Sequence, residues 1–142
     1  MDSDIYLGKK SSIERCLSRI KEEMASGKDP LRDLTRMDAV VLNLQRACEM
    51  SIDVAIHAIS HHQLGLPQTA RDAFRILTDA KVLTHDLGER LKKMVGFRNI
   101  AVHDYQSVTP EILQLVLRDH LNDFNEFLAA LEHQWPLPPP KT

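Results

Sequence analysis

The sequence has little glycine, few aromatic residues and no long apolar run. Its 142 residues include five Gly, four Phe, two Tyr and one Trp, and the abundance of Leu, Ala, Glu, Lys and Arg favours helices over strands. No segment approaches the run of about 18 apolar residues that a membrane-spanning helix needs. We therefore expect a helical protein that does not cross a membrane.

The sequence also has few cysteines and a small net charge. The two cysteines, Cys16 and Cys48, fall inside apolar helical patterns, where a free thiol behaves as a small hydrophobic group rather than as half of a disulfide. The polar, acidic start at residues 1–4 does not resemble a signal peptide, so we expect a cytoplasmic protein. A formal net charge of -2 excludes a uniformly basic nucleic-acid coat, although it leaves room for a local basic site.

Apolar residues spaced three or four apart predict an all-α protein, an up-and-down bundle of about five helices. The expected helices cover residues 13–24, 38–60, 70–80, 85–103 and 110–132. The segment Gly27-Lys28-Asp29-Pro30 should end the first helix, and the apolar stripe of the second is wide enough to require burial from more than one side. We expect residues 1–133 to form one domain and residues 134–142 to form an extended, proline-rich tail.

Particular residues mark the helix ends and weak points. Thr69, Thr84 and Thr109 are the expected N-caps of the last three helices. Gly88 and Gly96 lie inside the predicted helix 85–103, where a glycine costs roughly 1 kcal/mol relative to alanine. A close approach of two helices, or a bend, should compensate for them.

Motifs for several kinds of catalysis are missing. The chain has no glycine-rich phosphate loop, no Cys-x-x-Cys pair and no Gly-x-Ser-x-Gly elbow, which excludes nucleotide hydrolysis of the P-loop type. His57 and His61 are spaced to share a metal ion, but the sequence supplies no evident third ligand. Histidines at the end of a long helix more simply complement its dipole. We expect neither a metal site nor a cofactor.

One polar cluster stands out, the segment Arg98-Asn99-Ile100-Ala101-Val102-His103-Asp104-Tyr105, which reads Arg-x4-His-x-Tyr. A histidine can take the proton from a ribose 2′-hydroxyl or protonate the leaving oxygen, and an arginine can hold the phosphate. Asn99 can position either group, and Tyr105 can donate a hydrogen bond or stack on a base. These roles suit RNA cleavage without a metal ion. The alternative is a surface feature that caps the helix.

The spacing places the two candidate catalytic residues on different sides of a helix. Arg98 and His103 lie about 140° apart at roughly 100° per residue, whereas Asn99 and His103 share a face. Either the helix loosens before His103, or a second copy of the chain supplies the complementary residue. Both routes favour a cleft at a helix end.

Three charged residues on the predicted helix 38–60 are ambiguous. Asp38, Arg46 and Asp53 lie among apolar neighbours. They either line the cleft of a dimer or form structural ion pairs, and the structural interpretation is preferred.

The cluster from Arg98 to His103 resembles the Arg-x4-6-His motif of HEPN domains, and with Tyr105 it resembles the form found in HepT toxins. Residues 35–47 (TRMDAVVLNLQRA) and 92–99 (KKMVGFRN) are also similar to HepT segments, and the resemblance covers about residues 5–131. It implies a HEPN-like helical bundle that acts as a toxic ribonuclease. Arg98 and His103 would be catalytic, and Asn99 and Tyr105 would support them.

The resemblance also implies partners. The chain would form a homodimer whose two motif copies face a shared cleft, and its substrate would be RNA, either tRNA or mRNA. Its antitoxin would be an MntA-like minimal nucleotidyltransferase that transfers AMP from ATP to Tyr105, blocking the cleft with bulk and negative charge. The alternative is a non-catalytic HEPN-like module that binds a nucleotide or docks a nucleotidyltransferase. The joint presence of Asn99, His103 and Tyr105 favours the enzyme.

Overall fold

The computed structural model describes residues 2–139, apart from 26–28 and 30, and it confirms the all-α prediction. Its elements are α1 (Ser3–Ala25), α2 (Leu34–His61), α3 (Ala70–Asp79), α4 (His85–His103), the 3-10 turn η1 (Tyr105–Ser107), α5 (Pro110–Asp119) and α6 (Asp123–Gln134). The described residues contain no strand, and none of their helices is long and apolar enough to span a membrane. Gly27, Lys28 and Pro30, expected to end the first helix, lie outside the described residues.

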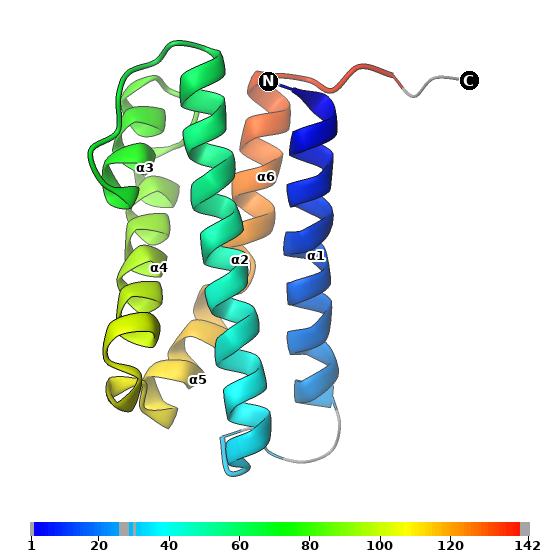
Figure 1. Ribbon diagram of the computed structural model, residues 1–142, viewed down its shortest axis with the longest axis vertical. Helices are drawn as coiled ribbons and strands as arrows, with labels where there is room; N and C mark the ends of the chain where they lie inside the picture. The colour runs from blue at the N-terminus through cyan, green and yellow to red at the C-terminus, as the bar shows by residue number, and fades with distance from the viewer. Residues whose placement is uncertain (1, 26–28, 30, 140–142) are drawn as a thin grey trace.

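The helices form an up-and-down bundle with α2 at its centre (Figure 1). α1 runs down the bundle and α2 returns beside it, after which α4 runs down on the other side of α2 and α6 climbs back. The short α3 lies beside α4, and α5 crosses the lower end. Because α2 packs against α1, α3 and α4, it is the helix on which the others depend.

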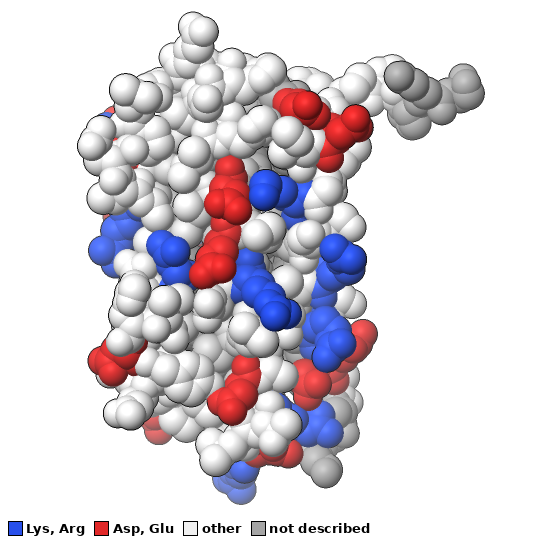
Figure 2. Space-filling view, viewed as in Figure 1, with Lys and Arg blue, Asp and Glu red and all other residues white. Residues whose placement is uncertain are grey.

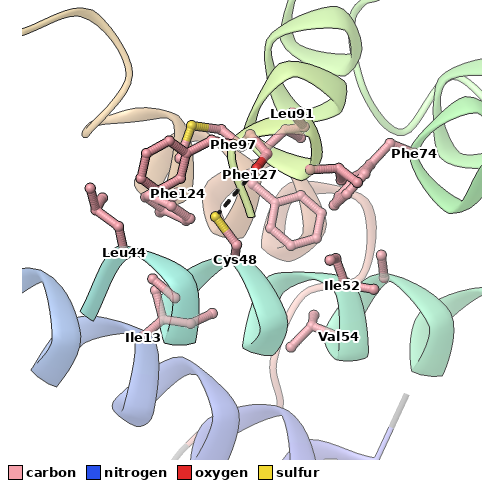
Figure 3. Close-up of a cluster of buried hydrophobic side chains, with 14 of the residues drawn as sticks. Ile13, Leu44, Cys48, Ile52, Val54, Phe74, Leu91, Phe97, Phe124 and Phe127 are labelled. Atoms are coloured by element: carbon pink, nitrogen blue, oxygen red, sulfur yellow. Dashed lines mark hydrogen bonds between the residues drawn. The ribbon is translucent and has the colours of Figure 1, made fainter. Parts of the chain in front are cut away.

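The wide apolar stripe of α2 is buried on several sides, as predicted. Leu44, Cys48 and Ile52 point from α2 towards the phenylalanine rings of α4 and α6, while Val54 points towards α1 (Figure 3). All four side chains are at most 7% exposed. A helix buried in this way is held in one rotational setting, because any turn about its axis would expose apolar surface.

The three predicted threonine caps are present. The hydroxyl oxygens of Thr69, Thr84 and Thr109 each accept a hydrogen bond from a backbone N–H three residues further on, at 3.0, 3.2 and 3.2 Å. α2 begins earlier than predicted, at Leu34, because the Asp33 carboxylate caps it. The cap places residues 34–37 in the helix, and Met37 among them is buried in the core.

Gly88 is the site of a close approach between α3 and α4, as expected of a glycine inside a helix. A Cβ atom at this position would collide with the Oγ1 atom of Thr78 on α3. At Gly96 a Cβ atom would lie 2.8 Å from Arg71 Nη2, which is the end of a flexible side chain. Only Gly88 is therefore required by the packing of one helix on another.

The predicted helix 110–132 is wrong in one respect, because a turn at residues 120–122 divides it into α5 and α6. Apolar residues continue at helical spacing across the turn, so the pattern alone predicts a single helix. Asp123 explains the new start. Its side chain is 1% exposed, and its carboxylate accepts hydrogen bonds from Arg90 of α4 and, at 2.9 Å, from His120 Nδ1. The carboxylate also lies in the first turn of α6, where the helix dipole favours it.

The end of α6 is tied to the end of α2. Trp135 stacks on His62 with ring centroids 4.0 Å apart, and Leu137 packs, partly buried, against the core. Residues 136–139 carry no helix, in agreement with their proline content. The prediction for residues 140–142 falls outside the described residues.

We expect Asp123→Ala to lower the free energy of unfolding by about 2–4 kcal/mol, because it leaves Arg90 and His120 without their buried partner. Urea unfolding followed by circular dichroism measures the change. Asp119→Ala is the matched control, since the Asp119 carboxylate pairs with Arg118 on the surface, where ion pairs contribute little. Equal losses in the two variants would contradict the role given to Asp123.

Candidate functional site

The Arg-x4-His-x-Tyr motif lies at the end of α4 and in the turn η1 that follows it, at the lower end of the bundle (Figure 1). Arg98 and Asn99 are half-buried, whereas His103 and Tyr105 are exposed. α4 remains helical through His103, and the Asp104 N–H closes it by donating back into the last turn at 2.8 Å. The helix therefore does not loosen before His103, and Arg98 and His103 stay on different sides of it.

Arg98 is held against α2 as a charge without a carboxylate partner. Its Nε atom is buried and forms no hydrogen bond with any described residue. The guanidinium lies close enough to α2 to act on the Cys48 thiol: burial raises the pKa of Cys48 to about 12, and the Arg98 charge opposes the shift. No ion pair among the described residues includes Arg98. Its charge is thus available to an anion such as a phosphate.

Tyr105 joins the motif to the start of α2. Its side chain is 43% exposed, and its hydroxyl donates a hydrogen bond to the carboxylate of Asp38. Burial of the phenol and this bond to Asp38 raise the pKa of Tyr105 to about 12. Tyr105 is therefore a protonated phenol that a carboxylate holds at the protein surface.

The three ambiguous charges of α2 separate into different roles. Asp38 belongs to the motif region through its bond with Tyr105. Asp53 forms an exposed ion pair with Lys9 of α1 at 3.5 Å, in agreement with the structural interpretation. Arg46 lines a groove between α1 and α2. The sequence marks Asp38 only as an ambiguous charge, and its contact with Tyr105, 67 positions away, follows from the tertiary structure.

Asn99 and the α2 histidines complete the set of predicted candidates. The Asn99 side chain forms no hydrogen bond with the described residues, and it lies one turn before His103 on nearly the same face. The ring centroids of His57 and His61 are 6.3 Å apart. Across the part of the chain that the structure describes, no three His, Cys, Asp or Glu side chains are grouped so as to hold a metal ion.

The arrangement provides three chemical groups at one helix end. The Arg98 guanidinium can bind a phosphate, the exposed His103 imidazole can transfer protons, and the exposed Tyr105 phenol can act as a nucleophile or hydrogen-bond donor. Arg98 and His103 lie about 140° apart around an intact helix.

Comparison with known proteins gives consistent matches over most of the chain. Residues 13–131 match the family model described as Ribonuclease HepT-like. An mRNA nuclease HepT of Shewanella oneidensis is 44% identical over 130 residues, which cover 92% of this chain and 98% of the relative. A tRNA nuclease HepT of Aphanizomenon flos-aquae is 26% identical over 98 residues, which cover 64% of this chain and 67% of the relative.

A solved structure agrees with these matches. It contains a tri-AMPylated HEPN toxin of Shewanella oneidensis in complex with an MNT antitoxin. The toxin chain superposes with a TM-score of 0.87 and is 43% identical, and the match covers 94% of this chain and 99% of that chain. The similarity thus extends over the whole bundle and includes the end of α4.

We expect the Tyr105 phenol to keep its proton well above the ordinary tyrosine pKa of about 10, and to titrate near pH 12 as its pKa of about 12 requires. Because the folded chain holds this proton more tightly than the unfolded chain, the stabilisation that it provides is complete below about pH 10. It is lost as the pH rises through the folded pKa. NMR titration of labelled tyrosine rings, assigned with Tyr105→Phe, measures the value.

Asp38→Asn tests the cause of that shift. It removes the negative charge at nearly constant size, so the pKa of Tyr105 should fall towards its ordinary value. Asp104→Asn is the control, because the Asp104 carboxylate precedes Tyr105 in the chain but accepts a hydrogen bond from Ser107 instead. A Tyr105 pKa that is unchanged in Asp38→Asn would contradict the contact.

Proposed function

We propose, from the fact that this chain belongs to the family of HepT-like ribonucleases, that it is a cytoplasmic endoribonuclease that cleaves RNA without a metal ion. We further propose that it is the toxin of a toxin–antitoxin pair. One observation carries the proposal: an unneutralised guanidinium, an exposed imidazole and an exposed phenol, from Arg98, His103 and Tyr105, lie at the same helix end. The relative that shares 44% identity over 98% of its length is an mRNA nuclease.

In the proposed reaction, the ribose itself supplies the nucleophile. His103 takes the proton from a 2′-hydroxyl, and the 2′-oxygen forms a bond with the adjacent phosphorus as the bond to the 5′-oxygen breaks. The leaving 5′-oxygen takes its proton from water, and the product carries a 2′,3′-cyclic phosphate. Arg98 binds the non-bridging oxygens, on which charge builds in the transition state. Asn99 positions the phosphate or the imidazole.

A homodimer supplies the second set of groups. The intact helix keeps Arg98 and His103 about 140° apart, so one chain does not direct both at a single phosphate. A two-fold axis that brings the ends of two α4 helices together would let Arg98 of one copy face His103 of the other. Exposed apolar side chains support this arrangement: Ile56 on α2 is 41% exposed, and Val102 on α4 is 45% exposed.

The antitoxin is an MntA-like minimal nucleotidyltransferase that modifies Tyr105. The phenol oxygen attacks the α-phosphorus of ATP, pyrophosphate leaves, and the phenol proton passes to Asp38, which already accepts the hydrogen bond of that hydroxyl. The resulting AMP places a phosphate near Arg98 and fills the path of the RNA. Support comes from the toxin structure at 43% identity, which is tri-AMPylated and bound to its MNT antitoxin.

We expect His103→Ala and Arg98→Ala each to reduce RNA cleavage by at least about 100-fold, because the first removes the proton acceptor and the second the phosphate ligand. Gel assays of purified chain on total RNA, and growth after induction, measure the effect. His85→Ala is the control, since His85 is an exposed histidine at the opposite end of α4. Cleavage that survives both changes, or that is lost only with a chelator, would contradict the mechanism.

Incubation with ATP, Mg²⁺ and the nucleotidyltransferase should add AMP to the parent chain and none to Tyr105→Phe, as measured by intact mass. Asp38→Asn should slow the transfer while leaving the acceptor in place. The other tyrosine is an internal control, because the Tyr6 hydroxyl is buried against Glu132. AMP mapped to Tyr6, or full neutralisation of Tyr105→Phe by the antitoxin, would show that modification of Tyr105 is not the inhibitory step.

A further inference from the structure

A groove between α1 and α2 carries positive charge that the motif does not account for. Its walls include Arg15 and Arg19 from α1 and Asn43 and Arg46 from α2, and no carboxylate of the described residues lines it. Figure 2 shows lysine and arginine side chains over the α1 and α2 part of this face, with acidic side chains beside them. The chain as a whole has a formal charge of -2, so a local excess of arginine requires an explanation.

The groove arginines are largely unneutralised. Arg46 forms no ion pair with any described residue, and Arg15 contacts only the Ser12 hydroxyl, at 3.3 Å. Arg19 has one loose and largely exposed contact with Glu22, at 3.8 Å. Elsewhere, arginines are bound more closely by carboxylates: Arg36, Arg75, Arg90 and Arg118 each have such a contact at 2.9 Å or less.

Arginines from both walls of the groove act on the same residue, Cys16. Cys16 of α1 lies in the groove, where burial raises the pKa of its thiol and the charges of Arg46 and Arg15, one from each wall, oppose the shift. Both guanidiniums are therefore close to the same atom. Two uncompensated cations that face one groove repel each other, and an anion between them would relieve the repulsion.

The groove begins one residue along α2 from the contact that holds Tyr105. Ala39, the residue after Asp38, lines the groove, and Asp38 accepts the hydrogen bond of Tyr105. Arg46 lies eight residues further along the same helix, which is about 12 Å at the usual helical rise. An RNA strand whose reacting phosphate lies beside Tyr105, and which follows α2, would reach Arg46 within a few nucleotides.

We propose that Arg15, Arg19 and Arg46 form a binding site for the phosphodiester backbone of single-stranded RNA, extending the cleavage site along the α1–α2 groove. This inference rests on the proposed function. Guanidiniums bind phosphates in bidentate fashion, and the groove has no aromatic side chain on which a base could stack. The groove therefore positions RNA without reading its sequence.

The test uses Arg15→Gln/Arg19→Gln/Arg46→Gln and a fluorescent 2′-O-methyl RNA oligonucleotide, which lacks the attacking hydroxyl and so stays intact. Anisotropy titrations at several salt concentrations should show an affinity at least about tenfold lower than that of the parent. The slope of log affinity against log salt concentration should be smaller by about two, because three phosphate contacts are lost. Arg32→Gln/Arg75→Gln/Arg118→Gln is the control, with the same change in net charge on exposed side chains outside the groove. Its affinity should stay within about twofold of the parent.

An affinity and a salt slope equal to those of the parent in the groove variant, with thermal melting unchanged, would overturn the inference. So would normal oligonucleotide binding combined with loss of the nucleotidyltransferase complex, because the groove would then be a protein interface. Cleavage of unmodified RNA by the parent is measured in parallel. If the parent binds the probe through the groove but cleaves no RNA, the proposed nuclease fails and the binding site stands.

Discussion

The packing of α4 against α2 and α3 is the constraint on which the site depends. At one end of α4, Gly88 allows α3 to approach until a Cβ atom would collide with Thr78, and at the other the Tyr105 hydroxyl binds Asp38 of α2. Between them, the Cys48 thiol donates to the Met94 carbonyl oxygen across the interface at 3.7 Å. With both ends set, α4 presents Arg98 towards α2 and His103 to solvent.

The distribution of charge follows from the same architecture. Where an arginine holds helices together, carboxylates surround it, as Asp86, Asp123 and Glu126 surround Arg90. Arg98 and Arg46 have no such partners among the described residues. A guanidinium without a carboxylate partner is a group that can bind an anionic ligand.

Local signals in the sequence predict most of the fold. Threonine caps depend on residues within one turn of each other, and all three form as predicted. The apolar spacing locates the first two helices but not their starts, which lie earlier, at Ser3 and Leu34. The division of the last helix could not be predicted, because the apolar spacing does not change at the turn and Asp123 takes its partner from α4, 33 residues away. Long-range polar contacts of this kind are invisible to periodicity.

The candidate site was predictable to the same extent. Arg98, Asn99, His103 and Tyr105 are neighbours in the chain, and the helical angle between Arg98 and His103 follows from their spacing. The role of Asp38 required the tertiary structure. The groove formed by Arg15, Arg19 and Arg46 required it as well, because the α1 and α2 residues alternate with core positions in the sequence and meet only when the two helices pack.

The central claim is that Arg98 of one chain and His103 of another act on one phosphate, and complementation tests it most directly. Inactive Arg98→Ala and His103→Ala chains are unfolded together, refolded as a mixture and assayed for RNA cleavage. A shared cleft predicts recovery of about a quarter of the parent activity, because half of the dimers are mixed and each has one intact site of two. A mixture as inactive as either variant alone, with mixed dimers confirmed by mass, would contradict the claim.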